Sequence, residues 1–221
     1  MPIINVIKKF LRLSGFIPFF PIFRDDYRIS KINSWYVNTE LLKYQVDKKS
    51  KDKNLLFYFC KNGDWDTEIT PIKETEHYKI LKHLYNDGNT YNRRETIEYF
   101  LKRSRTQNPF NNNGIILDNK QRVEKYVDYC IRILVSMKNN GFDEKLGSGA
   151  IGVAISRKGE ILKTFDGRHR LSAAILTNTP YVKIKITNLH RVLVQASFLR
   201  FSDIKDTLNE YKSKTKAKFE K

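Results

Sequence analysis

Residues 151–187 carry the feature that most constrains this fold: three strand-like segments and one helix-like segment, separated by glycine turns. Ile151, Val153 and Ile155 alternate with small residues, which is the period of a half-buried strand. The same reading predicts a turn at 157–159, a second strand at 160–165, a helix at 168–177 and a third strand at 181–186. The order of these segments predicts a sheet on which the helix packs.

The junction between the second strand and the helix is the first candidate site. The first N–H groups of a helix have no partner within the helix, and they attract anions. Gly167 can adopt a positive φ angle, and Arg168, His169 and Arg170 add side-chain donors at the same place. Cations in a first turn oppose the helix dipole, so this cluster favours an anion beside it. The alternative is an ordinary helix with a solvated basic first turn.

The motif at this junction resembles a known family. Ile-x-Val-x-Ile, a glycine turn, Asp-Gly-Arg-His-Arg-Leu-Ser-Ala-Ala at 166–174 and a proline-led strand resemble the core of the ParB/sulfiredoxin superfamily. That group includes chromosome-partition nucleotide-binding domains, sulfiredoxins and free-serine kinases. The resemblance implies an α+β fold, with a small mixed sheet, helices packed on it, a mainly helical insertion and an N-terminal extension.

The resemblance also implies which residues hold a nucleotide. The predicted phosphate-binding set is Asp166, Gly167, Arg168, His169, Arg170, Ser172 and His190. The nucleotide is expected to be ATP or another NTP, with Mg²⁺ bridging phosphate oxygens and held in part by Asp166. His190 follows the last strand, where it either contacts a phosphate or substrate or has a structural role.

A second candidate site is the tetrapeptide Gly63-Asp64-Trp65-Asp66. Two carboxylates one residue apart, after a strand and a glycine, can hold Mg²⁺ or accept a proton from a substrate hydroxyl. The same residues are also common in turns and at helix caps. ParB-like proteins with a Gly-Asp-Trp-Asp segment before the motif favour the functional reading. We therefore predict Asp64 and Asp66 as catalytic residues.

Length and charge limit the domain organisation and the partners. A chain of 221 residues predicts one domain at 25–211, with a nucleotide-binding core at 151–190 and a helical part at 74–140. A basic tail is expected at 212–221. The formal charge of +17 predicts affinity for polyanions such as nucleic acid, anionic membranes or phosphorylated molecules. Two distant cysteines give no disulfide framework, so a reducing compartment is expected.

The N-terminal segment, 1–24, combines an amphipathic basic helix with an aromatic stretch broken by two prolines. It is too short and interrupted for a membrane-spanning helix, but it suits the surface of an anionic membrane. The alternative is packing on the protein's own core. The expected location is therefore cytoplasmic, either free or peripheral on the inner face of the cell membrane.

The remaining segments give further secondary-structure predictions, and 119–139 has the strongest helical pattern in the chain. Helices are predicted at 74–85, 94–101, 119–139 and within 192–211, short strands at 35–37 and 55–60, turns at 87–89 and loops at 48–53 and 106–113. Asn140-Gly141 is a typical helix end. Cys130 falls on the apolar stripe of the third helix and is expected to be core packing.

Three functions follow from these features. Sulfiredoxin chemistry is excluded because Arg168 occupies the position of the required cysteine. A partition-type DNA-binding protein fits the charge, but only about 35 residues follow the last strand, too few for a helix-turn-helix and a dimerisation segment. A nuclease, as in some ParB-like relatives, would need a cluster of metal ligands, which the sequence does not provide. A kinase that transfers phosphate from ATP to a small-molecule or sugar hydroxyl, as in surface-polysaccharide metabolism, fits more of the chain. A catalytically silent nucleotide-binding adaptor remains a third class.

Overall fold

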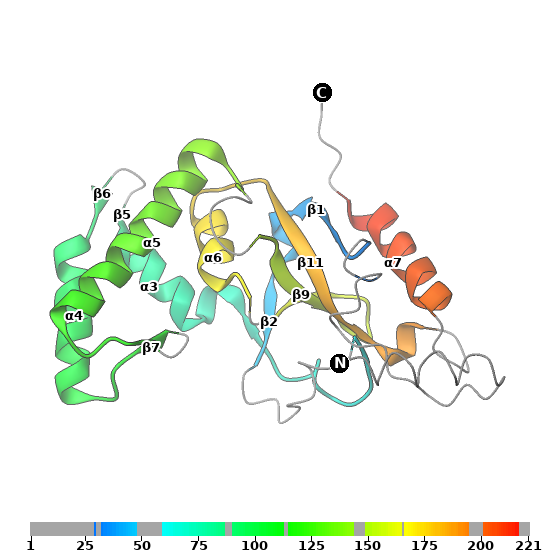
Figure 1. The fold of residues 1–221 in the computed structure, drawn as a ribbon, viewed down its shortest axis with the longest axis horizontal. Coiled ribbons are helices and arrows are strands. Elements are labelled where there is room, and N and C mark those ends of the chain that lie inside the picture. The colour runs from blue at the N-terminus through cyan, green and yellow to red at the C-terminus, as the bar shows by residue number, and fades with distance from the viewer. Residues whose placement is uncertain are drawn as a thin grey trace, which may run out of the picture.

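The chain folds into a mixed α+β structure, which confirms the predicted fold class (Figure 1). The computed structural model describes residues 29, 32–47, 59–86, 90–112, 115–143, 149–164, 166–194 and 201–216. The predictions for the N-terminal segment 1–24, the loop 48–53, most of the strand 55–60 and the turn 87–89 lie outside these residues.

One seven-stranded sheet forms the centre of the described structure. Its strands are β1 (Ser34–Asn38), β2 (Tyr44–Val46), β3 (Cys60–Lys61), β4 (Ile69–Pro71), β9 (Ile151–Ile155), β10 (Ile161–Lys163) and β11 (Tyr181–His190). The order is β1-β11-β9-β10-β2-β4, and β3 pairs with β11. The β11–β9, β10–β2 and β11–β3 pairs are parallel, whereas β1–β11, β9–β10 and β2–β4 are antiparallel. The sheet is therefore mixed, as predicted.

Helices and two small hairpins complete the fold. The α-helices are α3 (Glu76–Leu84), α4 (Arg93–Thr106), α5 (Lys120–Asn140), α6 (Arg168–Leu176) and α7 (Phe201–Thr215), and short 3₁₀ turns lie at Thr39–Leu41, Ile72–Glu74 and Arg191–Leu193. The hairpins pair β5 (Tyr85–Asn86) with β6 (Thr90–Tyr91) and β7 (Asn111–Asn112) with β8 (Ile115–Ile116). The region 74–140 is therefore mainly helical, with β7 falling inside the segment predicted as a loop.

Helix α5 shows why the local predictions succeeded here. The side chain of Asn119 accepts a hydrogen bond from the backbone N–H of Arg122, at 3.0 Å, which caps the helix start. Gly141 ends the helix with a φ of 67°, a conformation that costs glycine little. The apolar stripe of α5 is buried, and Cys130 is fully buried within it.

The helices lie on both sides of the sheet (Figure 1). Helix α6 follows β10 directly and packs between the sheet and helices α3 and α5, while α4 packs on α5. Ala173 and Ala174 are completely buried, which lets α6 approach its neighbours closely. One large hydrophobic core joins the sheet to these helices. This arrangement fixes the start of α6 at one end of β10.

Helix α7 packs against β1 on the opposite side of the sheet from α6 (Figure 1). The indole Nε1 of Trp35 donates a hydrogen bond to the hydroxyl of Thr215, at 3.1 Å. Lys216 forms an antiparallel bridge with Val37. The expected tail at 212–221 thus begins later than predicted, because residues 212–215 belong to α7.

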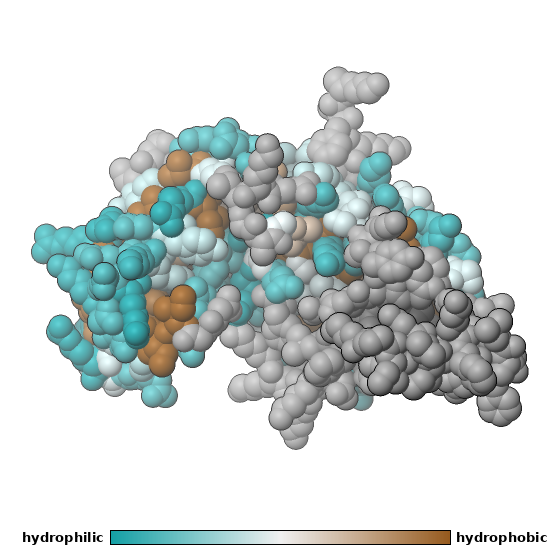
Figure 2. Space-filling model, in the orientation of Figure 1, coloured by the Kyte–Doolittle hydropathy of each residue, from teal (hydrophilic) through white to brown (hydrophobic). Residues whose placement is uncertain are grey.

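Figure 2 shows a surface that is hydrophilic over α4 and hydrophobic near the β7–β8 hairpin. Ile115 and Ile116 of this hairpin are 57% and 41% exposed. Among the residues that the structure describes, no helix is long and apolar enough to cross a membrane.

Candidate functional site

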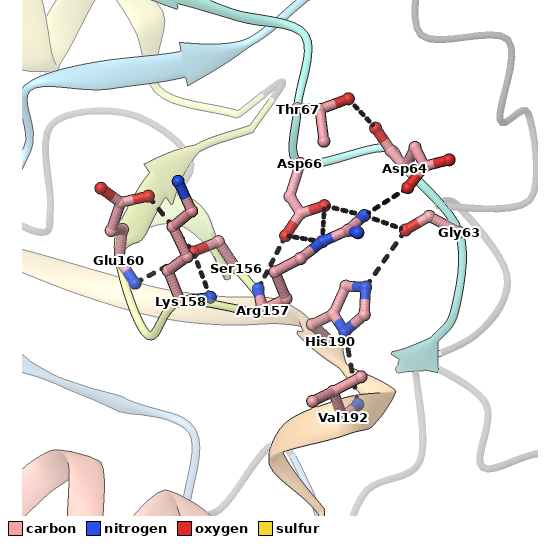
Figure 3. Close-up of polar contacts among 10 residues, drawn as sticks. All are labelled: Gly63, Asp64, Asp66, Thr67, Ser156, Arg157, Lys158, Glu160, His190 and Val192. Atoms are coloured by element: carbon pink, nitrogen blue, oxygen red, sulfur yellow. Dashed lines mark hydrogen bonds and ion pairs between the residues drawn. The ribbon is translucent and has the colours of Figure 1, made fainter.

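The Gly63–Asp66 loop is held by Arg157, which lies in the turn between β9 and β10 (Figure 3). The carboxylate of Asp66 accepts hydrogen bonds from the backbone N–H of Arg157 at 2.7 Å, from Nε at 2.9 Å and from Nη2 at 2.7 Å. Arg157 Nη2 also donates to the carbonyl of Gly63 and to Oδ1 of Asp64, each at 2.7 Å. We call Gly63, Asp64, Asp66, Arg157 and His190 the Arg157 cluster.

The two aspartates of this cluster differ sharply in exposure. The side chain of Asp66 is 1% exposed, whereas that of Asp64 is 81% exposed. Desolvation favours a raised pKa for Asp66, but the hydrogen bonds from Arg157 outweigh it, so the pKa of this carboxyl is lowered. A buried, ion-paired carboxylate with a lowered pKa is a weak proton acceptor. The predicted catalytic role therefore fits Asp64 better than Asp66.

His190 completes the Arg157 cluster (Figure 3). Its Nε2 lies 3.1 Å from the carbonyl oxygen of Gly63, and a carbonyl can only accept, so Nε2 carries the proton. Its Nδ1 accepts from the backbone N–H of Val192, at 3.3 Å. Its ring also lies against Trp65, with centroids 5.8 Å apart. Both ring nitrogens thus have partners within the protein, which favours the structural alternative for His190.

The start of α6 depends on two glycines. Gly167 has a φ of 79°, and a Cβ atom on it would lie 3.3 Å from Arg170 Nη2 and from the Cα of Ile151. A Cβ on Gly152 would lie 3.1 Å from the Cβ of Asp166 and 3.0 Å from the hydroxyl oxygen of Thr164. Gly167 has the positive φ that the sequence predicted, and the two glycines let Asp166 and Gly167 lie directly against β9.

Three cationic side chains gather at this end of β10. We call Lys163, Arg168 and Arg170 the α6 cation cluster. Burial lowers the pKa of all three groups, and in each case Asp166 acts in the opposite direction. Among the described residues, Asp166 is the one carboxylate that acts on all three. The predicted phosphate site therefore brings three basic side chains close together.

Lys163 belongs to this cluster although the sequence analysis did not select it. It is the last residue of β10, and its side chain is completely buried. Its Nζ donates to the carbonyl of Thr164, at 2.5 Å. The signal that could have selected it was its position three residues before Asp166, next to the motif.

Two other members of the predicted phosphate-binding set are buried. The ring of His169 is enclosed by His77, Tyr126 and Tyr129, and its Nε2 lies 2.9 Å from the hydroxyl of Tyr126. Burial, together with Arg168, lowers its pKa to about 4, so the ring is neutral near pH 7. Ser172 is 2% exposed. His169 is therefore a neutral ring packed among aromatic side chains, with its Nε2 already paired with the Tyr126 hydroxyl.

Metal binding has limited support from this geometry. Across the residues that the structure describes, no group of three or more His, Cys, Asp or Glu side chains could hold a metal ion. Asp166 is exposed at the start of α6, where it could supply one oxygen ligand. Cys60 and Cys130 are free thiols, and burial raises the pKa of each to about 12.

Comparisons with known proteins add no relative. No family model, no curated protein and no solved structure matches this chain. The functional argument therefore depends on the residues and geometry described above.

Proposed function

We propose that this protein binds the phosphates of a nucleotide at the start of α6. The observation that carries the proposal is the α6 cation cluster, in which three buried or half-buried basic side chains gather at a helix start and both arginines lower the pKa of Lys163. Guanidinium groups match phosphate oxygens in geometry, and the N–H groups of a helix start favour anions. A bound polyphosphate would offset the repulsion among these cations.

The reaction that we propose is phosphoryl transfer from ATP, or another NTP, to a hydroxyl group of a small molecule or sugar. This reaction requires mainly positioning of the reactants and neutralisation of charge. Gly167, Arg168 and Arg170 would bind the phosphates, and Asp166 would supply one ligand to a Mg²⁺ ion held chiefly by phosphate oxygens. Mg²⁺ would neutralise charge that develops on the transferred group. Asp64 would orient or deprotonate the acceptor hydroxyl.

A nucleotide-binding adaptor without catalysis is the second candidate. It is favoured by one observation: both predicted catalytic aspartates are ion-paired with Arg157. In the adaptor reading, the Gly63–Asp66 loop has a purely structural role. The likeness to ParB/sulfiredoxin proteins supports nucleotide binding in either reading and remains a proposal.

DNA binding is the alternative that the net charge of +17 favours. Affinity for duplex DNA that falls steeply with salt and disappears near physiological ionic strength would identify non-specific attraction. Tight binding that survives physiological salt would favour the DNA alternative over the kinase.

Arg170→Ala tests the proposed site. Isothermal titration with ATP should show at least tenfold weaker binding than wild type, because a charge-assisted bond to phosphate contributes roughly 1.5–3 kcal/mol. Arg94→Ala is the matched control, since the side chain of Arg94 is 91% exposed on α4. Equal ATP affinity for wild type and Arg170→Ala would show that the site is wrongly placed.

Asp64→Ala separates the kinase from the adaptor. In the kinase, this variant retains ATP binding and loses transfer to the acceptor hydroxyl. In the adaptor, neither wild type nor variant shows turnover with any acceptor, although both bind ATP.

A further inference from the structure

The β7–β8 hairpin presents an apolar side chain on each of its two faces. Ile115 and Ile116 are adjacent residues of β8, and they are 57% and 41% exposed. Adjacent residues of a strand point to opposite faces, so one isoleucine lies on each face of this two-stranded ribbon. A hairpin lying flat on the core would bury one of them. Because neither is buried, the ribbon projects from the surface that carries it.

The base of the hairpin, in contrast, is fixed to the core. Phe110, directly before β7, and Leu117, directly after β8, are both buried. The backbone N–H of Leu117 donates to the carbonyl of Phe110, at 2.9 Å, which continues the ladder of the hairpin. The ring of Phe110 packs on Phe100 of α4 and Tyr126 of α5. The exposed isoleucines therefore stand on a well-packed support, which limits the entropy lost when they bind a partner.

Charge is absent from the hairpin and concentrated beside it. No Asp, Glu, Lys or Arg occurs at 106–117, whereas the flanking segments 102–105 and 118–125 carry six basic residues and two acidic ones. The guanidinium carbon of Arg103 lies 5.6 Å from the centroid of the Phe110 ring, so the end of α4 adjoins the hairpin base. Figure 2 shows the hydrophobic patch next to the hydrophilic surface of α4. The result is an uncharged projection with a basic surround.

Most of these flanking cations are open to a partner. Two of the six are paired: Arg103 with Glu76 and Arg122 with Asp118. The other four are exposed and, within the described part of the chain, form no ion pair; they are Lys102, Arg105, Lys120 and Lys125. The surround therefore retains positive charge that the protein itself does not neutralise.

We propose that the β7–β8 hairpin inserts into the surface of a membrane with anionic headgroups. Lipid can surround a ribbon that is apolar on both faces, whereas a protein with a flat docking surface would contact only one face. Inserting a charged side chain is costly, and the hairpin has none. The exposed cations beside it attract anionic headgroups. DNA binding depends on phosphate contacts, for which the hairpin itself has no cation. The inference does not depend on the nucleotide site.

Co-sedimentation of the full chain with vesicles of phosphatidylcholine and about one third phosphatidylserine tests the proposal. Wild type should bind these vesicles more tightly than vesicles of phosphatidylcholine alone, and added salt should weaken the binding. The double variant Ile115→Ser, Ile116→Ser should bind about tenfold more weakly, because two aliphatic side chains no longer leave water.

The matched control replaces two exposed aliphatic side chains elsewhere on the protein. Leu41 and Val192 are 43% and 66% exposed, outside the hairpin. The double variant Leu41→Ser, Val192→Ser should bind the vesicles as tightly as wild type. The Tm of both double variants should stay within about 2 °C of wild type, since replacing exposed residues changes stability little.

A tryptophan in the hairpin reports where the membrane contact lies. Residues 1–24 also suit a membrane surface, so vesicle binding alone does not locate the contact. In Ile115→Trp, brominated lipid should quench the new indole on binding to the anionic vesicles. Trp35 and Trp65 are buried, so their emission in wild type should remain unquenched.

Three results would overturn the proposal. Equal vesicle binding by wild type and the double isoleucine variant, without quenching of Ile115→Trp, would place the membrane contact elsewhere. A dimer in sedimentation velocity that this variant loses, without vesicle binding by wild type, would identify a second copy as the partner. Duplex DNA binding that the variant loses, again without vesicle binding, would identify nucleic acid. ATP titration of the same variant tests the nucleotide site separately.

Discussion

The two ends of β10 differ in the charged side chains that lie beside them. At one end, Arg157 meets two carboxylates and a carbonyl, and each partner lies within 2.7 Å of Nη2. At the other end, Lys163 is buried beside two arginines, and Asp166 is the one carboxylate that acts on all three in the described chain. The strand between them has only three residues.

This difference shows why a count of motif residues is a poor guide to a binding site. The Arg157 cluster contains carboxylates typical of catalysis, yet its polar groups already satisfy one another, so it can stabilise the loop without a ligand. The α6 cation cluster brings basic side chains close together, so a bound anion would stabilise it further. Removing a negative charge from the Arg157 cluster should therefore lower the stability of the fold. At the α6 end, stability should fall when a positive charge is added.

The largest expected effect tests the α6 end and concerns His169. Its folded pKa of about 4 lies below the unfolded value of about 6.5, so the unfolded state binds the proton first. Stability contributed by neutral His169 is present above pH 6.5 and is lost as pH falls towards 4. With 1.36 kcal/mol per pKa unit, the loss reaches about 3 kcal/mol.

Urea unfolding across this pH range measures the loss. The His169→Gln variant should lose less stability than wild type between these pH values. His83→Gln, which replaces an exposed histidine on α3, should follow wild type. Parallel curves for wild type and His169→Gln would mean that His169 is not held neutral.

The next effect tests the Arg157 end. Asp66→Asn removes a buried negative charge and weakens the hydrogen bonds that it accepts from Arg157, so the free energy of unfolding should fall by about 2 kcal/mol. Arg157 is 34% exposed and can be hydrated, which keeps the loss below that of a fully buried pair. Urea unfolding at neutral pH provides the measurement.

Asp64→Ala is the control for that comparison, because it removes the exposed partner of the same guanidinium. A surface ion pair contributes about 0–1 kcal/mol, so this variant should remain close to wild type. Equal losses for the two variants would contradict the distinction between a buried structural carboxylate and an exposed one.

The smallest effect concerns the hydroxyl group that holds His169. Tyr126→Phe removes the partner of His169 Nε2 and should cost about 1 kcal/mol in urea unfolding. Tyr129→Phe is the matched control, since Tyr129 lies on the same helix and its ring also contacts His169. The control should be neutral, and an equal loss in both variants would exclude a specific role for the Tyr126 hydroxyl.

The sequence predicted helices, strands and turns well where the pattern lay in neighbouring residues. The strands at β9 and β11, the turn at Gly159 and helix α6 follow from the alternation of apolar residues and from glycine positions. The start and end of α5 follow from Asn119 and Gly141. These features depend on residues within a few positions of one another.

The sequence could not predict contacts between distant segments. Arg157 lies 91 residues from Asp66 and 93 from Asp64, and no local pattern marks these pairs. Lysine in a short strand is usually exposed, so Lys163 gave no sign of its burial. Consecutive helical residues project about 100° apart, which is why His169 could not point the same way as its neighbours on both sides.

Helix α7 has a consequence for how the protein is made. Trp35 bonds to Thr215, 180 positions later, and a Cβ on Gly159 in the β9–β10 turn would lie only 2.2 Å from the hydroxyl oxygen of Tyr211. On the ribosome, the contacts between β1 and α7 can therefore form only after Thr215 has been translated, 180 positions after Trp35. Until then, the apolar side chains that α7 covers lack this partner, which gives chaperones an interval in which to act.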